Sequence, residues 1–260
     1  MFDIKGILAM LNGEEFPEAF SYLSSIDENT DAYEIASTLV TLDQPEDFPG
    51  FMIDFITELY ESAIGSGNAQ AMNDLGALYY DGHRGFEQSF EKAMMYYHLA
   101  AQLGNQQAQE NLGYCYYYGR DGKRDYEKAF HYFALGAFNG QLISLYKIGD
   151  MYLNGYYVDK NETEAFRIFV RCLQTMTEEA EGRVAGPLFL RLGKMHLEGL
   201  GTEKDLKAAL ACYQRAEFFL YDMVKGGDDM YRSSLETAID GVERARKELA
   251  DELPPKSWVF

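Results

Sequence analysis

Ser89 and Lys92 have the S-x-x-K spacing of a serine nucleophile and the lysine beside it. Such a pair would support acyl transfer, as in the enzymes that recognise penicillin. Neither the S-D-N nor the K-T-G element that completes those sites occurs in the sequence. The alternative is that Ser89 caps a helix and Lys92 lies in its first turn. The pattern of the surrounding chain, described below, favours the cap.

The other residues that could do chemistry show no catalytic or metal-binding spacing. The three cysteines, Cys115, Cys172 and Cys212, are far apart and form no C-x-x-C pair. The four histidines form no i, i+4 pair, and we expect His196 to be a packed side chain. Phosphate-binding glycine loops and calcium loops do not occur either. The sequence therefore predicts no metal, no cofactor, no catalytic residue and no enzyme activity.

A pattern that occurs four times organises the chain. The motif [LI]-G-x-x-[YH]-x-x-G recurs at spacings of 37, 36 and 44 residues, at 75–82, 112–119, 148–155 and 192–199. A second block follows each copy, at 89–101, 125–137, 161–173 and 205–217. Each second block opens with a residue type favoured at helix N-caps: Ser89, Asp125, Asn161 and Asp205. Four pairs of helices are therefore predicted.

Small and large side chains alternate on the second helix of each predicted pair. An alanine and an aromatic residue are four positions apart, and so share one helix face. They are Ala93 and Tyr97, Ala129 and Phe133, Ala165 and Phe169, Ala209 and Tyr213. Each first helix contains a glycine, although glycine costs about 1 kcal/mol against alanine there. We therefore expect the partner helix to approach closely at Gly76, Gly113, Gly149 and Gly193.

These blocks resemble the Sel-1-like repeat, a relative of the tetratricopeptide repeats. The family pattern fits best at Ala71–Gly104 and Ala108–Gly140, and the last two copies depart from it. The resemblance implies an all-α fold, a right-handed superhelix (solenoid) of helix pairs, and an adaptor or scaffold role. Some members of the family carry a β-lactamase label, but in this repeat Ser89 occupies the N-cap position.

The repeats divide the chain into three predicted segments. Residues 1–67 would form degenerate helix pairs, 68–227 the four repeats, and 228–260 a capping helix and a tail. The repeats run at about 71–107, 108–143, 144–186 and 187–227. The third has about eight extra residues, which we expect to lengthen its second helix. The tail, with the single Trp258, would fold back on the cap or remain a free ligand.

The charge is strongly acidic and unevenly distributed. The formal net charge is −19, and residues 1–67 hold 14 acidic residues against one basic residue. Such a surface repels nucleic acid and anionic membranes, and is compatible with a basic protein or peptide. The sequence contains no apolar run of 18 residues. We expect a cytoplasmic chain, with a monomer as the default state.

Tyrosines gather at residues 114–118, YCYYY. Helical spacing assigns Ala108, Leu112, Cys115 and Tyr116 to the core and the other tyrosines to the opposite face. In solenoids of this kind the first helices line the concave surface. The partner-binding residues predicted for that groove are Asn73, Ala77, Tyr80, Glu110, Tyr114, Tyr117, Tyr118, Tyr146, Lys147, Asp150, Arg191 and Lys194.

Three functions remain open from the sequence. The first is a non-catalytic scaffold that binds a protein or peptide in the groove. The second is an inhibitor or immunity-type protein that neutralises a basic partner through its acidic N-terminal third. The third is a β-lactamase-like enzyme, which only the Ser89–Lys92 spacing favours.

Overall fold

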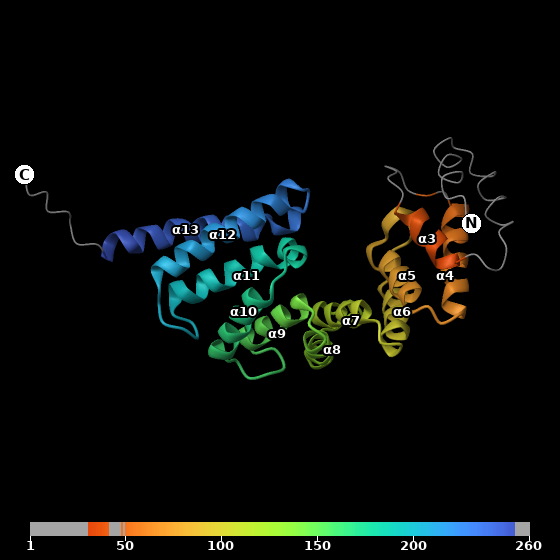
Figure 1. The fold of residues 1–260 in the computed structure, drawn as a ribbon, viewed down its shortest axis with the longest axis horizontal. Helices are drawn as coiled ribbons and strands as arrows, with labels where there is room; N and C mark the ends of the chain where they lie inside the picture. Colours follow the sequence, from red (N-terminus) through yellow and green to blue (C-terminus); the bar gives the residue numbers. More distant parts are fainter. Residues whose placement is uncertain (1–30, 42–47, 49, 253–260) are drawn as a thin grey trace, which may run out of the picture. The chain divides into compact units, whose positions relative to one another are not determined.

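The computed structural model describes residues 31–41, 48 and 50–252, and within them every regular element is a helix (Figure 1). The described helices belong to two compact units, Met1–Asp125 and Tyr126–Phe260. The helix pairs predicted within residues 1–30 and the tail at 253–260 lie outside the described residues.

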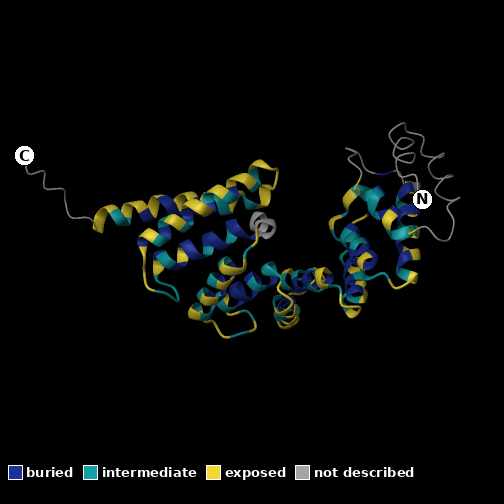
Figure 2. Ribbon diagram, in the orientation of Figure 1, coloured by how far each residue is buried: buried dark blue, intermediate teal, exposed yellow. Residues whose placement is uncertain are grey.

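The N-terminal unit stacks antiparallel helix pairs. Its elements are α3 (Ala32–Val40), α4 (Gly50–Gly65), α5 (Ala69–Asp81), the 3-10 turn η1 (His83–Gly85), α6 (Phe90–Gln102) and α7 (Gln106–Tyr118). Their facing sides form a core that includes Leu39, Met52, Ile56, Tyr60 and Leu75, all nearly inaccessible to solvent (Figure 2). Within the predicted N-terminal segment, the described residues form the helix pair α3 and α4.

The C-terminal unit continues the same plan and ends in a long helix. It contains α8 (Tyr126–Phe138), α9 (Leu142–Asn154), α10 (Glu162–Thr175), α11 (Glu178–Glu198), α12 (Leu206–Lys225), η2 (Asp229–Tyr231) and α13 (Arg232–Glu252). Helix α13 packs on α11 and α12 (Figure 1), with Ala238, Val242 and Ala245 buried and most of its acidic and basic residues exposed. A capping helix requires one apolar face toward the last repeat and one polar face toward solvent.

The interior glycines lie against aromatic rings of the paired helix. A Cβ atom at Gly149 would be only 2.5 Å from the Phe169 ring. The same atom would be 2.8 Å from Tyr97 at Gly76 and 2.9 Å from Tyr213 at Gly193. The close approach predicted from the sequence is thus confirmed at these three glycines, while Gly113 is buried and its approach stays a prediction.

The extra residues of the third repeat lengthen a different helix from the one predicted. Helix α10 ends at Thr175, whose hydroxyl donates to the backbone oxygens of Arg171 and Cys172, and Met176 is extended. These bonds satisfy carbonyls that a helix end leaves without partners. The added length belongs to α11, the first helix of the fourth repeat, which contains Pro187. The prediction of a longer second helix was wrong.

We expect Gly149→Ala to lower the free energy of unfolding by about 1–2 kcal/mol. Overpacking against Phe169 costs roughly 1–3 kcal/mol, and alanine's helix preference returns up to about 1 kcal/mol. Urea denaturation followed by circular dichroism measures the change. Gly65→Ala on α4, where a Cβ meets nothing within 4 Å, is the matched control and should be neutral or slightly stabilising. Equal stabilities of the two variants would contradict the close-approach argument.

Candidate partner-binding site

The twelve predicted binding residues differ widely in exposure. Tyr118 and Lys194 are exposed, and Ala77, Tyr80, Tyr114, Tyr117 and Arg191 are partly exposed. The other five are buried: Asn73, Glu110, Tyr146, Lys147 and Asp150. Their prediction as groove-facing side chains was wrong, because helical spacing alone cannot show that a polar residue lies between packed helices.

Two of the buried polar residues bond across helices within their own units. The Asn111 amide of α7 donates to the Asn73 side-chain oxygen of α5 at 3.1 Å. Asp150 of α9 forms a 2.9 Å ion pair with Arg191 of α11. A buried polar group is costly unless it is hydrogen-bonded, so these contacts explain why such side chains are tolerated inside. Their role is to join first helices of successive repeats.

Three tyrosines of α7 do form a ring cluster. The Tyr114 and Tyr118 rings stack with centroids 6.1 Å apart and planes 5° from parallel. The Tyr117 ring meets Tyr118 edge to face at 5.1 Å. Tyr118 retains 45% of its surface, the largest share of the three. The helix ends at this residue because Gly119, at φ 70°, takes a left-handed conformation that glycine adopts without steric cost.

Arg120, just beyond that glycine, connects the cluster to the neighbouring pair of helices. Its Nε donates to the Tyr80 hydroxyl at 2.9 Å. The guanidinium carbon lies 5.0 Å from the Phe90 ring centroid, 5.5 Å from Tyr80 and 5.7 Å from Tyr118. Three rings from α5, α6 and α7 therefore hold one exposed cation by cation–π contacts. We call Tyr80, Phe90, Tyr114, Tyr117, Tyr118 and Arg120 the tyrosine cluster.

The sequence analysis did not predict Phe90 or Arg120 as site residues. Their places depend on the turn at Gly119, which brings Arg120 back over rings 30 and 40 residues away in the chain. Burial raises the pKa of Tyr80, and Arg120 opposes this rise. The Tyr80 phenol therefore keeps its proton at neutral pH.

Cys115 and Cys172 are buried thiols, and Cys212 is half-buried. Burial raises the pKa to about 12 for both Cys115 and Cys172 and to about 11 for Cys212. A thiol must lose its proton to act as a nucleophile, so these three are unreactive at neutral pH. The prediction that Cys115 belongs to the core, with Ala108, Leu112 and Tyr116, is confirmed.

Ser89 is the N-cap of α6. Its hydroxyl oxygen accepts from the backbone N–H of Lys92 at 3.3 Å, and Asn161 and Asp205 cap α10 and α12 in the same way. The Lys92 ammonium lies 4.7 Å from the Tyr79 ring centroid. Both residues of the S-x-x-K spacing thus have helix-stabilising contacts.

We expect Ser89→Ala to lower the free energy of unfolding by about 1 kcal/mol, because it removes the cap acceptor. Ser89→Asp keeps an acceptor at the same position and should retain most of the stability. Thermal or urea denaturation of both variants measures the difference. If aspartate destabilised the protein as much as alanine, the serine would not act as a cap.

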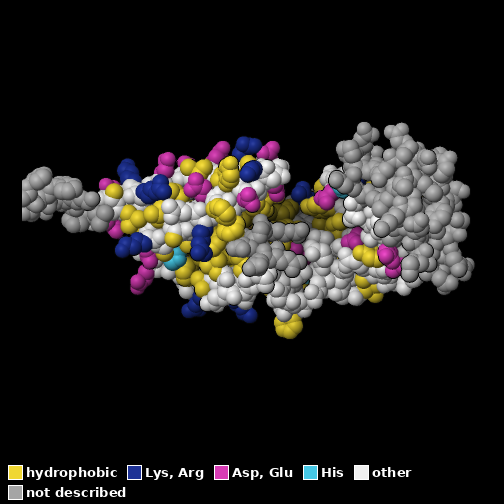
Figure 3. Space-filling model, turned by 45° about the horizontal axis from the view of Figure 1, so that its top comes forward, with side chains coloured by type: hydrophobic (Ala, Val, Ile, Leu, Met, Phe, Trp, Pro, Cys, Tyr) yellow, Lys and Arg dark blue, Asp and Glu magenta, His cyan; other side chains and the backbone are white. Residues whose placement is uncertain are grey.

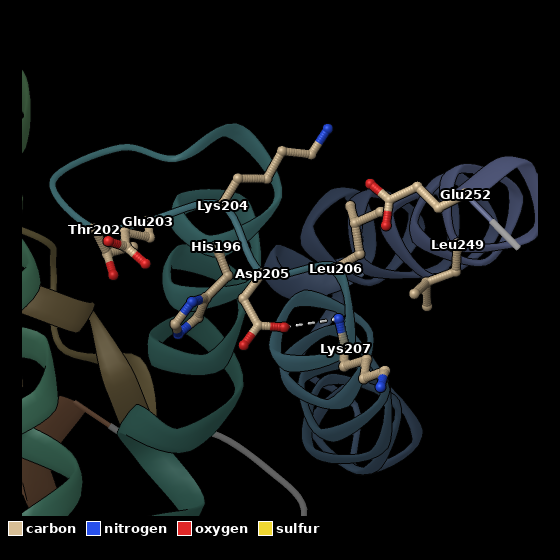
Figure 4. Close-up of a pocket in the computed structure, with 9 residues that line it drawn as sticks. All are labelled: His196, Thr202, Glu203, Lys204, Asp205, Leu206, Lys207, Leu249 and Glu252. Atoms are coloured by element: carbon tan, nitrogen blue, oxygen red, sulfur yellow. Dashed lines mark hydrogen bonds between the residues drawn. The ribbon is translucent and has the colours of Figure 1, made fainter.

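His196 lines a shallow pocket at one end of the C-terminal unit. The pocket, of about 530 Å³, lies among the end of α11, the start of α12 and the end of α13 (Figure 4). The Asp205 carboxylate there accepts from the backbone N–H of Lys207, so it caps α12 (Figure 4). No described residue bonds the buried Nδ1 of His196, and the Phe166 ring meets the imidazole edge to face. Burial lowers the pKa of His196, which is packed as predicted, while Asp205 opposes the shift.

His196 should make the protein less stable in mild acid. Because its folded-state pKa is lower, the unfolded chain takes up the proton first, and stability is lost as pH falls below about 6.5. His196→Tyr, which restores the residue type of the other repeats, should show a smaller loss between about pH 7.5 and 5. Urea midpoints at both pH values measure it. Equal losses of stability in the wild-type protein and the His196→Tyr variant would contradict the assignment of the effect to His196.

The described residues contain no group of three His, Cys, Asp or Glu side chains placed to hold a metal. Among the described helices, none is long and apolar enough to cross a membrane.

Comparison with known sequences agrees with the repeat pattern. The sequence profile of the Sel1 repeat matches residues 69–105, 106–140, 142–171 and 190–217. The chain therefore belongs to the Sel1 repeat family, whose members are typically non-catalytic scaffolds for protein interactions.

A curated relative and several solved structures are similar to the chain. The relative is the ERAD-associated E3 ubiquitin-protein ligase component HRD3B of Arabidopsis thaliana, 30% identical over 200 residues. The match covers 74% of this chain but only 28% of that protein.

The first structure is c5321, a protective antigen of uropathogenic Escherichia coli with an SLR fold. It is 19% identical with a TM-score of 0.59, over 84% of this chain and 45% of that one. The second is a Sel1 repeat protein from Oxalobacter formigenes, 18% identical with a TM-score of 0.58. The match covers 82% of this chain and 84% of that one. Both show the solenoid fold of helix pairs, as the sequence predicted.

Proposed function

We propose that the protein is a non-catalytic scaffold that binds a partner protein or peptide at the tyrosine cluster. The observation that carries this proposal is the exposed Tyr118, stacked on Tyr114 and joined through Arg120 to rings of two other helices. Tyrosine and arginine are the residue types that contribute most at binding hot spots. The repeat family supports the same class of function.

The cluster is suited to a peptide segment because its groups are already held in place. Tyrosine supplies a large apolar surface with few rotatable bonds, so ordering it on binding costs little entropy. The Arg120 Nε is used by Tyr80, whereas its terminal nitrogens have no described hydrogen-bond partner. We expect an apolar or aromatic partner side chain on Tyr118, and a carboxylate or backbone carbonyl on Arg120.

An inhibitory role against a basic protein is the second candidate. It is favoured by the charge, because Lys5 is the only lysine or arginine before Arg84. Binding driven by net charge weakens steeply as the salt concentration rises, whereas binding at a ring cluster depends less on salt. Affinity for the purified partner at low and high ionic strength separates the two candidates.

We expect Tyr114→Ala combined with Tyr118→Ala to abolish partner binding and leave the fold intact. The experiment is affinity co-purification from the native host, followed by a binding titration with the purified partner. Tyr221→Ala, which removes an even more exposed tyrosine from α12, is the control and should retain binding. Melting temperatures of all three proteins show whether the fold is kept. Unchanged binding by the double variant would exclude the tyrosine cluster.

A further inference from the structure

Helix α6 carries a line of exposed apolar side chains on the face away from α5. Met95 and Leu99 of α6 and Leu103, the residue that caps its C-terminal end, follow one another at four-residue steps, so they lie along one side of the helix. They retain 50%, 40% and 56% of their surface. We call these three residues the α6 ridge. Scattered exposed leucines are ordinary, but three in line form a continuous apolar strip of the kind that binds partners.

The ridge is separate from the tyrosine cluster in its residues. None of its three side chains has a ring contact or hydrogen bond with the cluster among the described interactions. Methionine and leucine side chains adapt to different partner surfaces, which suits helix-in-groove binding. The ridge is therefore a second candidate surface of the N-terminal unit.

The surroundings of the ridge indicate the charge of its partner. Helix α4 exposes Asp54, Glu58 and Glu61 and contains no lysine or arginine. Tyr96 of α6 packs on the core cluster that includes Met52, Phe55 and Tyr60 of α4. Burial chiefly raises the pKa of Tyr96, and the Glu61 carboxylate of α4 raises it further. The acidic end of α4 thus lies near Tyr96, the residue that follows Met95 of the ridge.

The two charges at the start of α6, Glu91 and Lys92, are both exposed and balance each other, so the acidity comes from α4. Glu91 is exposed one turn before Met95. The single cation of the helix, Lys92, lies over the Tyr79 ring. By contrast, acidic and basic side chains are interspersed over the C-terminal helices on the face drawn in Figure 3. The apolar ridge of α6 thus has a neighbouring helix, α4, whose exposed charges are all acidic.

We propose that the α6 ridge binds an amphipathic helix of a partner protein whose apolar face is flanked by lysine or arginine. The apolar side chains would lie on Met95, Leu99 and Leu103, and the basic flank would face the carboxylates of α4. A second copy of the chain fits poorly, because it would bring the same carboxylates together. An anionic membrane surface is disfavoured for the same reason.

The test uses the full chain and two synthetic helices of about 18 residues, long enough to be helical when bound. Both have leucines at i, i+3, i+4 and i+7; one has lysine flanks and the other glutamate flanks. Fluorescence anisotropy measures their binding. We expect the lysine peptide to bind and the glutamate peptide not to bind.

The variants separate the ridge from general attraction by charge. Met95→Ser/Leu99→Ser/Leu103→Ser leaves the net charge unchanged and should weaken binding of the lysine peptide about tenfold or more. Leu135→Ser/Phe138→Ser, which removes two exposed apolar side chains of α8, should not. Glu58→Lys/Glu61→Lys should transfer preference to the glutamate peptide, and this reversal tests the surface independently of the serine variant.

Three results would overturn the proposal. Equal binding of the lysine peptide by the serine variant would show attraction by net charge alone. If Glu58→Lys/Glu61→Lys still preferred the lysine peptide, the carboxylates of α4 would not select the partner. A wild-type dimer in sedimentation that the serine variant dissociates would show that the ridge binds a second copy instead.

Discussion

The close contact between a glycine on the first helix and an aromatic ring on the second sets the geometry of three of the repeats. Where glycine is present, as at Gly76, Gly149 and Gly193, the ring lies directly on the neighbouring backbone. A bulkier residue would push the helices apart and would move every side chain beyond the contact. Interiors are as dense as crystals, so such a shift cannot be absorbed locally. The direction of each first helix, and of any surface on it, therefore depends on this contact.

The same contact explains why the core could be predicted from the sequence. The alanines and rings at four-residue spacing are all buried, as expected from helix geometry. The caps at Ser89, Asn161 and Asp205 were predictable because few residue types accept from the first turn. These are local rules that repeat with the sequence. The extra residues of the third repeat follow no repeated rule, and there the prediction of helix length was wrong.

The binding surface was less predictable because it depends on contacts between distant residues. Asp150 and Asn73 looked like groove residues by polarity and helical position, yet both are buried with partners on another first helix. Arg120 looked like an ordinary loop cation, yet it lies over three rings. In both cases the deciding partner is about 40 residues away. The sequence of a single repeat therefore does not show which distant residue its side chains contact.

Polar pairing and ring contacts also divide the first helices by function. Side chains bonded to the next first helix, such as Asn73 and Asp150, fix the stacking and are removed from solvent. Tyr116 fills the core position of the α7 motif, while Tyr114, Tyr117 and Tyr118 form rings of the tyrosine cluster. Exposed rings lower solubility unless a partner covers them. The partner that we propose would cover Tyr118 and bond Arg120 together.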